Sequence, residues 1–197
     1  MIQQFNQQHI HLLIDAFEND PMFVNLFKGL SKHHQMKAFF KFIYLRNHLM
    51  KGIYLTDSEE HLSYVAFIET PKNNHKYTLI SKARLSVEML KLAFYIPLKS
   101  LNLLSQYDRI TSEQRPFENH YYLTMIGVSV EKKGQGIGKK VINKIHQIVI
   151  SDVNTKMICL DTENKNNVTY YERLGYKLTN EVLTDHFSIY CMTWKQS

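Results

Sequence analysis

Residues 128–140 read VSVEKKGQGIGKK and place three alternating glycines between an expected strand and an expected helix. Glycine lets the backbone approach a ligand closely and adopt a positive φ angle. The first turn of a helix offers unpaired N–H groups and the positive end of a dipole, which together bind phosphate. Four lysines flank the glycines, namely Lys132, Lys133, Lys139 and Lys140. We therefore expect this loop to bind the phosphates of a small molecule.

Three nucleotide-binding loops are candidates for this glycine spacing. The P-loop pattern GxxxxGK[ST] fails, because Lys139 stands where its second glycine should follow Gly134. The dinucleotide-binding pattern GxGxxG meets the same lysine at its third glycine. Asp161, at the end of the next expected strand, mimics the ribose-binding acid of that second pattern. However, fewer than about 70 residues follow the loop, too few for a second mononucleotide-binding half.

The third loop is the [Q/R]xxGx[G/A] pattern that receives the pyrophosphate of coenzyme A in GNAT acetyltransferases, and residues 133–138 resemble it. Lys133 stands where the family usually has arginine or glutamine, and Val130 stands where many members have proline. Both departures are mild, because the loop of this family binds mainly through its backbone amides.

Three further segments carry the resemblance. Residues 164–176, NKNNVTYYERLGY, are similar to the GNAT segment N…(F/L)YE(K/R)LGF. Residues 120–128, HYYLTMIGV, resemble the HWYLxxLGV strand of a small-molecule subgroup that includes puromycin N-acetyltransferase-like proteins, and residues 16–23, AFENDPMF, resemble that subgroup's AFxxDPxF. Residues 72–115 match no motif. The resemblance is therefore strong evidence for the fold and the cofactor, and weak evidence for the identity of the acceptor.

Apolar periodicity gives the order of the elements. Helical spacing covers residues 10–17, 23–30, 36–43 and 80–104, with interruptions at Pro21 and near Pro97. Strand-like runs cover 52–56, 62–69, 121–130, 157–160, 176–178 and 187–194, and helices follow the loop and cover 168–174. The resemblance implies an α/β GNAT fold, a central mixed and mostly antiparallel twisted sheet flanked by helices on both faces. One domain, residues 1–197, would divide into an acceptor-side half, 1–115, and an acetyl-CoA-binding core, 118–178.

The resemblance also implies the residues that bind acetyl-CoA. In the family, the strand before the loop presents a free amide to the acetyl oxygen, and the loop receives the pyrophosphate. The residues expected to contact acetyl-CoA are Val128, Ser129, Val130, Lys133, Gly134, Gln135, Gly136, Ile137, Gly138, Lys139, Asn164, Asn167 and Tyr171. Asn164 matches the asparagine of the broad family and Asn167 that of the subgroup. Either one contacts the cofactor or caps the short helix.

Acetyl transfer also needs groups that move protons. Tyr171 matches the family tyrosine that protonates the departing sulfur, and a phenol with a pKa near 10 keeps its proton at neutral pH. The base that deprotonates the amine stays open at this stage. His120 precedes the central strand, and Asp161 and Glu163 follow the next one, where strand ends face a ligand crevice. The expected catalytic residues are Tyr171, His120 and Asp161.

Composition limits the partners. The net charge of +6 comes from scattered lysines and arginines without a basic stripe, which disfavours nucleic acid as a partner. The ten histidines and two cysteines show no metal-ligand spacing, so we expect no metal. No stretch approaches the ~18 apolar residues that span a bilayer, and the start lacks a signal-peptide pattern. We expect a cytoplasmic monomer or homodimer without a membrane partner.

These observations predict a transferase that moves the acetyl group of acetyl-CoA directly to a primary amine of a small molecule. Two alternatives stay open. One is an N-acetyltransferase for proteins or peptides, whose acceptor groove would be open and acidic. The other is a non-catalytic GNAT module that binds acyl-CoA.

Overall fold

The structure is a computed structural model that describes residues 5–71 and 79–196. Within these residues, six strands form one sheet in the order β1-β2-β3-β4-β6-β5. Only β3 and β4 are parallel neighbours, and the other adjacent pairs are antiparallel. The strands are β1 (Ile53–Thr56), β2 (Tyr64–Glu69), β3 (Tyr121–Val128), β4 (Met157–Thr162), β5 (Lys177–Leu183) and β6 (Ser188–Lys195). The expected mixed, mostly antiparallel sheet is confirmed.

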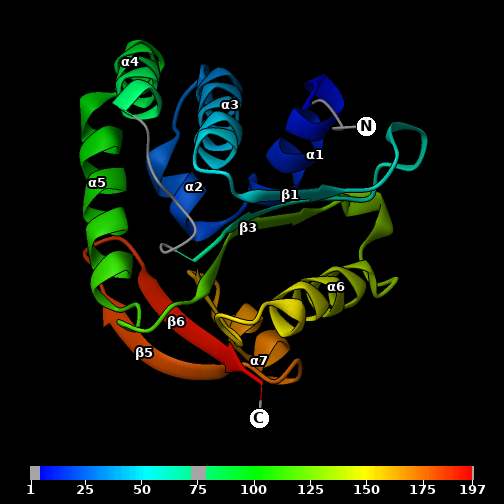
Figure 1. Cartoon of the computed structure of the whole chain (residues 1–197). Coiled ribbons are helices and arrows are strands. Elements are labelled where there is room, and N and C mark those ends of the chain that lie inside the picture. The colour runs from blue at the N-terminus through cyan, green and yellow to red at the C-terminus, as the bar shows by residue number, and fades with distance from the viewer. Residues whose placement is uncertain (1–4, 72–78, 197) are drawn as a thin grey trace.

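Helices cover both faces of the sheet. The described helices are α1 (Gln7–Phe17), α2 (Pro21–Leu26), α3 (Lys32–Leu49), α4 (Leu79–Tyr95), α5 (Leu98–Glu113), α6 (Ile137–Ser151) and α7 (Lys165–Glu172). Figure 1 shows α1 to α4 above the sheet, α6 and α7 below it, and α5 at its side, reaching down towards β5 and β6. This is the expected α/β arrangement with helices on both faces.

Each face of the central strands buries its own apolar cluster. On one face, Val65, Phe67 and Met125 pack with the apolar sides of α1, α2 and α3. On the other face, Ala66 and Leu123 pack with α6, α7 and the inner side chains of β4 and β6. Burial on both faces explains why the central strands read as continuous apolar runs rather than as alternating ones.

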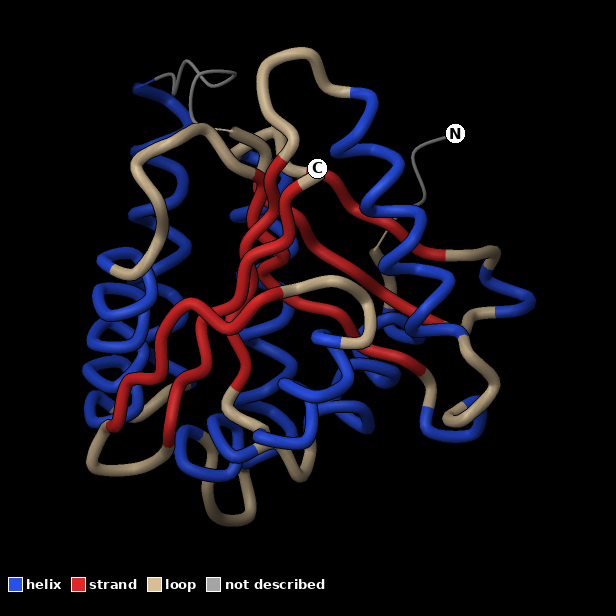
Figure 2. Tube along the Cα trace, turned by 90° about the horizontal axis from the view of Figure 1, so that it is seen from below, coloured by secondary structure: helices blue, strands red, loops and turns tan. Residues whose placement is uncertain are grey.

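The sheet opens between its two parallel strands. β3 and β4 pair at only three positions, Tyr121 with Ile158, Tyr122 with Cys159 and Leu123 with Leu160. β3 then continues to Val128 with β2 as its neighbour. Figure 2, seen from below, shows the strands fanning apart. The gap places the end of β3, the glycine loop and α7 around one opening.

Several element bounds differ from the sequence expectation; α2, for example, ends at Leu26 and not at residue 30. β3 ends at Val128 instead of residue 130, because residues Val130–Lys132 turn into a short 3-10 helix, η3. α5 continues nine residues beyond 104, to Glu113. β5 extends to Leu183, although only residues 176–178 were expected to be strand. Nearly all its side chains are exposed, so it carries no apolar alternation. None of the described helices is both long and apolar enough to cross a bilayer.

Candidate active site

The glycine loop has the backbone geometry of an anion-binding turn. Gly134 and Gly136 have φ angles of +80° and +75°, which favour glycine over residues with a side chain. A Cβ atom added at either glycine would meet nothing within 4 Å, so the space beside the loop is open. Gly136 is the N-cap of α6, and no side chain caps this helix start. The first N–H groups of α6 therefore remain available to a bound phosphate, and the loop fits a pyrophosphate.

The four lysines of the loop divide into two kinds. Lys132 Nζ donates to Ser63 Oγ at 3.1 Å and to the carbonyl oxygens of His61 and Leu62 at 3.2 and 3.3 Å. The Ser129 amide likewise donates to the Ser63 carbonyl at 2.8 Å. Lys132 and Ser129 thus fix the loop to the β1–β2 connection. The other three lysines, Lys133, Lys139 and Lys140, are exposed beside the glycines.

The adjacent tyrosines of α7 have different surroundings. Tyr170 is 38% exposed, and its hydroxyl would lie 2.7 Å from a Cβ atom added at Gly138. Tyr170 therefore packs against the first turn of α6. Tyr171 is only 8% exposed and lines a cavity of about 440 Å³. Burial first, then the nearby Tyr170 and Glu163, raises the pKa of Tyr171. The Tyr171 phenol keeps its proton at any physiological pH.

The two candidate asparagines also have different surroundings. Asn164 is the N-cap of α7, and its Oδ1 atom accepts from the Asn166 amide at 3.0 Å. Asn167 lines the same cavity as Tyr171, and its Nδ2 atom donates to Thr162 Oγ1 at 3.0 Å. Of the two, only Asn167 reaches the cavity.

Two buried acids lie in the cavity wall next to Tyr171. The Tyr107 hydroxyl, on α5, is hydrogen-bonded to the carboxyl groups of both Asp161 and Glu163, and the Tyr122 hydroxyl donates to Asp161. Burial raises the pKa of Asp161 to about 6. Burial first, and then the Asp161 charge, raises the pKa of Glu163 well above its usual range. A carboxyl group with a pKa of about 6, as Asp161 has, can accept and release a proton near neutral pH.

Comparison with known proteins agrees with this geometry. Residues 102–176 match the model of the acetyltransferase (GNAT) family, a match that covers less than half of the chain and includes β3, the glycine loop, α6, β4 and α7. An acetyltransferase from Corynebacterium glutamicum, described as histone acetyltransferase HPA2 and related acetyltransferase, is 17% identical with a TM-score of 0.64, over 98% of this chain and 94% of that chain. The chain has the GNAT acetyltransferase fold.

Two other structures with this fold bear names that point to different acceptors. Arylalkylamine N-acetyltransferase 2 from Aedes aegypti is 13% identical with a TM-score of 0.59, over 98% of this chain and 97% of that chain. A ribosomal-protein alanine N-acetyltransferase from Escherichia coli is 11% identical with a TM-score of 0.51, over 100% of this chain and 94% of that chain. The family match and the GNAT fold support an acetyl-CoA-dependent acyltransferase.

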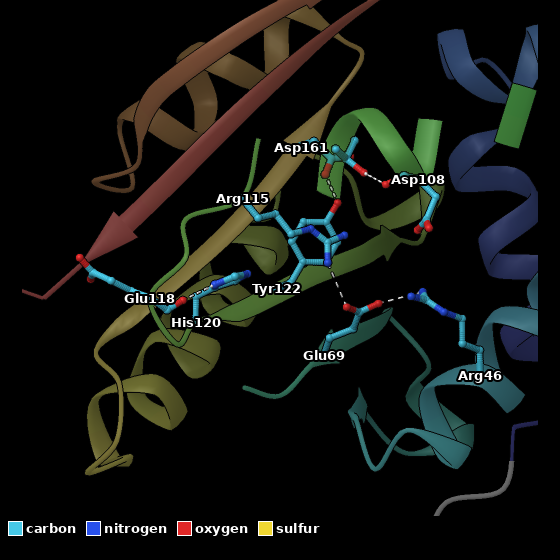
Figure 3. A network of polar contacts seen from close by, with 9 residues as sticks. Arg46, Glu69, Asp108, Arg115, Glu118, His120, Tyr122 and Asp161 are labelled. Carbon is cyan, nitrogen blue, oxygen red and sulfur yellow. Dashed lines mark hydrogen bonds and ion pairs between the residues drawn. The ribbon is translucent and has the colours of Figure 1, made fainter. Parts of the chain in front are cut away.

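A polar network next to the cavity fixes the position of Tyr122. Glu69 lies between two arginines, 2.8 Å from Arg46 and 3.2 Å from Arg115. The Arg115 guanidinium carbon lies 3.4 Å from the centroid of the Tyr122 ring, a cation–π contact. Figure 3 shows this chain of contacts running from Arg46 to Asp161. Residues from α3, β2 and β3, together with Arg115, which lies two residues beyond the end of α5, thus orient the hydroxyl that bonds Asp161.

His120 lies at the other end of the strand. Its Nδ1 atom is 2.8 Å from the Glu118 carbonyl oxygen, and the Glu118 carboxylate pairs with Lys195 at 3.2 Å. Because β3 and β4 are parallel and Tyr121 lies opposite Ile158, His120 is next to the start of β4, whereas Asp161 is near its end. His120 is not among the residues that line the cavity, and Figure 3 shows it apart from Asp161. The structure brings Tyr171 and Asp161 together, but not His120.

Sequence reasoning missed part of this site. Tyr107 and Arg115 both lie in the segment, residues 72–115, that matched no motif, and no local pattern links them to Asp161 or Tyr122. Among the described residues, no group of three or more His, Cys, Asp or Glu side chains is arranged to hold a metal ion.

Proposed function

We propose that this protein transfers the acetyl group of acetyl-CoA directly to a primary amine of a small molecule. The observation that carries the proposal is the cavity of about 440 Å³, which runs from Tyr171 at the β3–β4 opening to helices α1 to α5. Pockets for small ligands have volumes of about 300–1,000 Å³. Side chains of all five helices line it, among them Phe17, Phe39 and Leu101. Such a helix-lined cavity suits a small acceptor better than a peptide, which needs an open groove.

The cofactor side of the proposal uses the backbone around the glycine loop. Acetyl-CoA supplies an activated acetyl thioester. The segment Lys133 to Lys139 would bind its pyrophosphate through N–H groups and lysine charge. The pantetheine chain would run beside Val128, Ser129 and Val130. Because the Ser129 amide already donates to Ser63, the amides that bind the acetyl oxygen belong to other residues of this stretch. We assign the cavity contact to Asn167 and a capping role to Asn164.

The buried groups account for the protons of the reaction. The amine enters as an ammonium ion and gives one proton to the Asp161–Glu163 pair, which passes it to solvent. Its nitrogen then bonds to the acetyl carbon while the carbon–sulfur bond breaks. Tyr171 donates its proton to the departing sulfur. The Tyr171 phenolate then takes the remaining extra proton from the nitrogen and becomes a phenol again. The products are the amide, the free thiol and one released proton.

A thiol-release assay tests the proposal. The purified protein is mixed with acetyl-CoA and, separately, with a panel of small primary amines and a panel of peptides with free N-termini. We expect thiol release that depends on a small amine. Release only with peptides would support the protein-acceptor alternative. Binding of acetyl-CoA without any release would support a non-catalytic module.

A further inference from the structure

Part of the cavity lining is an apolar wall. It is formed by Phe17, Phe39, Phe42, Leu92, Leu101 and Leu104, which come from α1, α3, α4 and α5. The ring of Phe17 lies 5.0 Å from that of Phe23, and the ring of Phe23 lies 5.6 Å from that of Phe39. A ligand with an aromatic or branched aliphatic body would bury its surface against this wall, and each Å² of apolar surface removed from water favours binding by about 25 cal/mol.

The charges of the cavity favour a cation. Four acids line it: Asp20, Asp108, Asp161 and Glu163. Two arginines, Arg46 and Arg115, also line it, but both pair with Glu69 behind the wall. Burial is the first cause that raises the pKa values of Asp20, Asp161 and Glu163. These carboxylates lack solvation that a bound cation would restore.

We propose that the acceptor is a monoamine with a compact apolar body, whose ammonium group binds beside Asp161 and Glu163 while its body contacts the phenylalanine and leucine wall. This inference rests on the proposed function, because it places the amine beside Tyr171. It disfavours two other classes of small amine. A polyamine would bury a further charge against the apolar wall unless that charge reached Asp20 or Asp108, and an amino acid would bring its carboxylate next to the acids.

Binding measurements test the acceptor class without requiring turnover. The probes are 2-phenylethylamine, spermidine, phenylalanine and the uncharged 2-phenylethanol, titrated by calorimetry at pH 8 with coenzyme A present. We expect 2-phenylethylamine to bind at least about tenfold more tightly than each of the other three. Tighter binding of spermidine or phenylalanine would overturn the acceptor class. Equal binding of 2-phenylethanol would show that the acids do not recognise the ammonium.

A matched pair of variants links the preference to the acids. Glu163→Gln keeps the shape and an acceptor oxygen for Tyr107, so we expect it to be at least as thermally stable as the wild type at pH 8. It should lose at least about tenfold in affinity for 2-phenylethylamine and leave 2-phenylethanol binding unchanged. Glu181→Gln, an exposed acid on β5, should change neither. Unchanged amine affinity in a folded Glu163→Gln variant would overturn the proposal.

Kinetics separate this inference from the proposed function. Acetylation of spermidine with a higher kcat/KM than 2-phenylethylamine would overturn the acceptor class and leave acetyl transfer standing. Tight binding of 2-phenylethylamine without thiol release would support the cavity assignment and overturn the catalytic function.

Discussion

The glycine loop before α6 and the cavity lined by α1 to α5 are two binding regions of one fold, built from different atoms. The loop presents backbone N–H groups at the surface, within a stretch of a few residues. The cavity presents buried side chains from α1, α3, α5, β3 and the end of β4, which are far apart in the chain. Tyr171 lies where the two regions meet, on α7 beside the opening between β3 and β4.

This difference assigns separate tasks to the two regions. Backbone amides bind phosphate whatever side chains surround them, so the loop suits a cofactor that many enzymes share. Buried side chains set shape and charge, so the cavity decides which amine can enter. Substitutions in the loop should therefore change cofactor binding alone, and substitutions in the cavity should change the acceptor or the chemistry.

The largest effect is expected where the regions meet. Tyr171→Phe removes the proton that the departing thiolate needs and keeps the ring in its buried place. General acid catalysis is worth about 10²–10⁴-fold, so kcat should fall by that factor. The dissociation constant of acetyl-CoA should change little, because the hydroxyl acts on charge that develops only in the transition state.

Tyr170→Phe is the control for this variant. Its hydroxyl packs beside Gly138 outside the cavity lining, and we expect less than about a threefold change in kcat. Steady-state rates of both variants with one accepted amine decide the assignment. If Tyr170→Phe lost activity while Tyr171→Phe stayed active, Tyr170 and not Tyr171 would be the general acid.

The acids of the cavity should set the pH dependence. Asp161 accepts a proton only when ionised, and its pKa is raised to about 6. The kcat/KM of the wild type should therefore fall as the pH drops through about 6 and the Asp161–Glu163 pair takes up a proton. Asp161→Asn should lose about a hundredfold in kcat/KM at pH 8. A flat profile down to pH 5, together with an active Asp161→Asn variant, would remove the pair from catalysis.

Ligand-induced stabilisation tests the loop as a cofactor site. Acetyl-CoA should bind the native loop but not the unfolded chain. At one hundred times its dissociation constant, it should raise the free energy of unfolding by about 2.7 kcal/mol. NADH and ATP should raise it far less at the same concentration. Denaturant unfolding with each ligand measures the effect, and a larger effect of NADH would restore the dinucleotide alternative.

The smallest effect is expected for a single side chain in the loop. Gly136→Val places atoms in the open space beside α6 and should raise the KM for acetyl-CoA by about tenfold, roughly 1.4 kcal/mol. Both this variant and its control, Gly29→Val, carry the strain of a positive φ angle, +75° and +77°, and neither added Cβ meets an atom within 4 Å. Gly29 lies between α2 and α3, so its variant should keep the normal KM. Equal KM values would mean that Gly136 only forms a turn.

The same contrast explains what the sequence could predict. The loop, Tyr171 and the element order of residues 121–176 follow from local patterns, because glycines, capping and apolar periodicity act within a few residues. The sequence resemblance led to the GNAT fold, but left open whether Asn164 or Asn167 contacts coenzyme A. Tertiary contacts were needed to show that Asn164 caps α7 while Asn167 faces the cavity.

Local sequence patterns could not predict the residues on the acceptor side of the site. Tyr107 bonds Asp161 and Glu163 across more than fifty residues of sequence, and Glu69 pairs with Arg46 and Arg115 from two further elements. His120 resembled a catalytic histidine by its place in a motif. The parallel register of β3 and β4 puts it at the opposite strand end from Asp161. The length of β5 was missed, because an exposed edge strand needs no apolar alternation.

The central claim is direct acetyl transfer to a small amine, and a competition experiment tests it most directly. The protein is incubated with acetyl-CoA and an equimolar mixture of small primary amines and peptides with free N-termini, and the products are identified by mass spectrometry. We predict one added acetyl group on a small amine, no acetylated peptide, and loss of the product with Tyr171→Phe. Acetylated peptides with unmodified small amines would contradict the account.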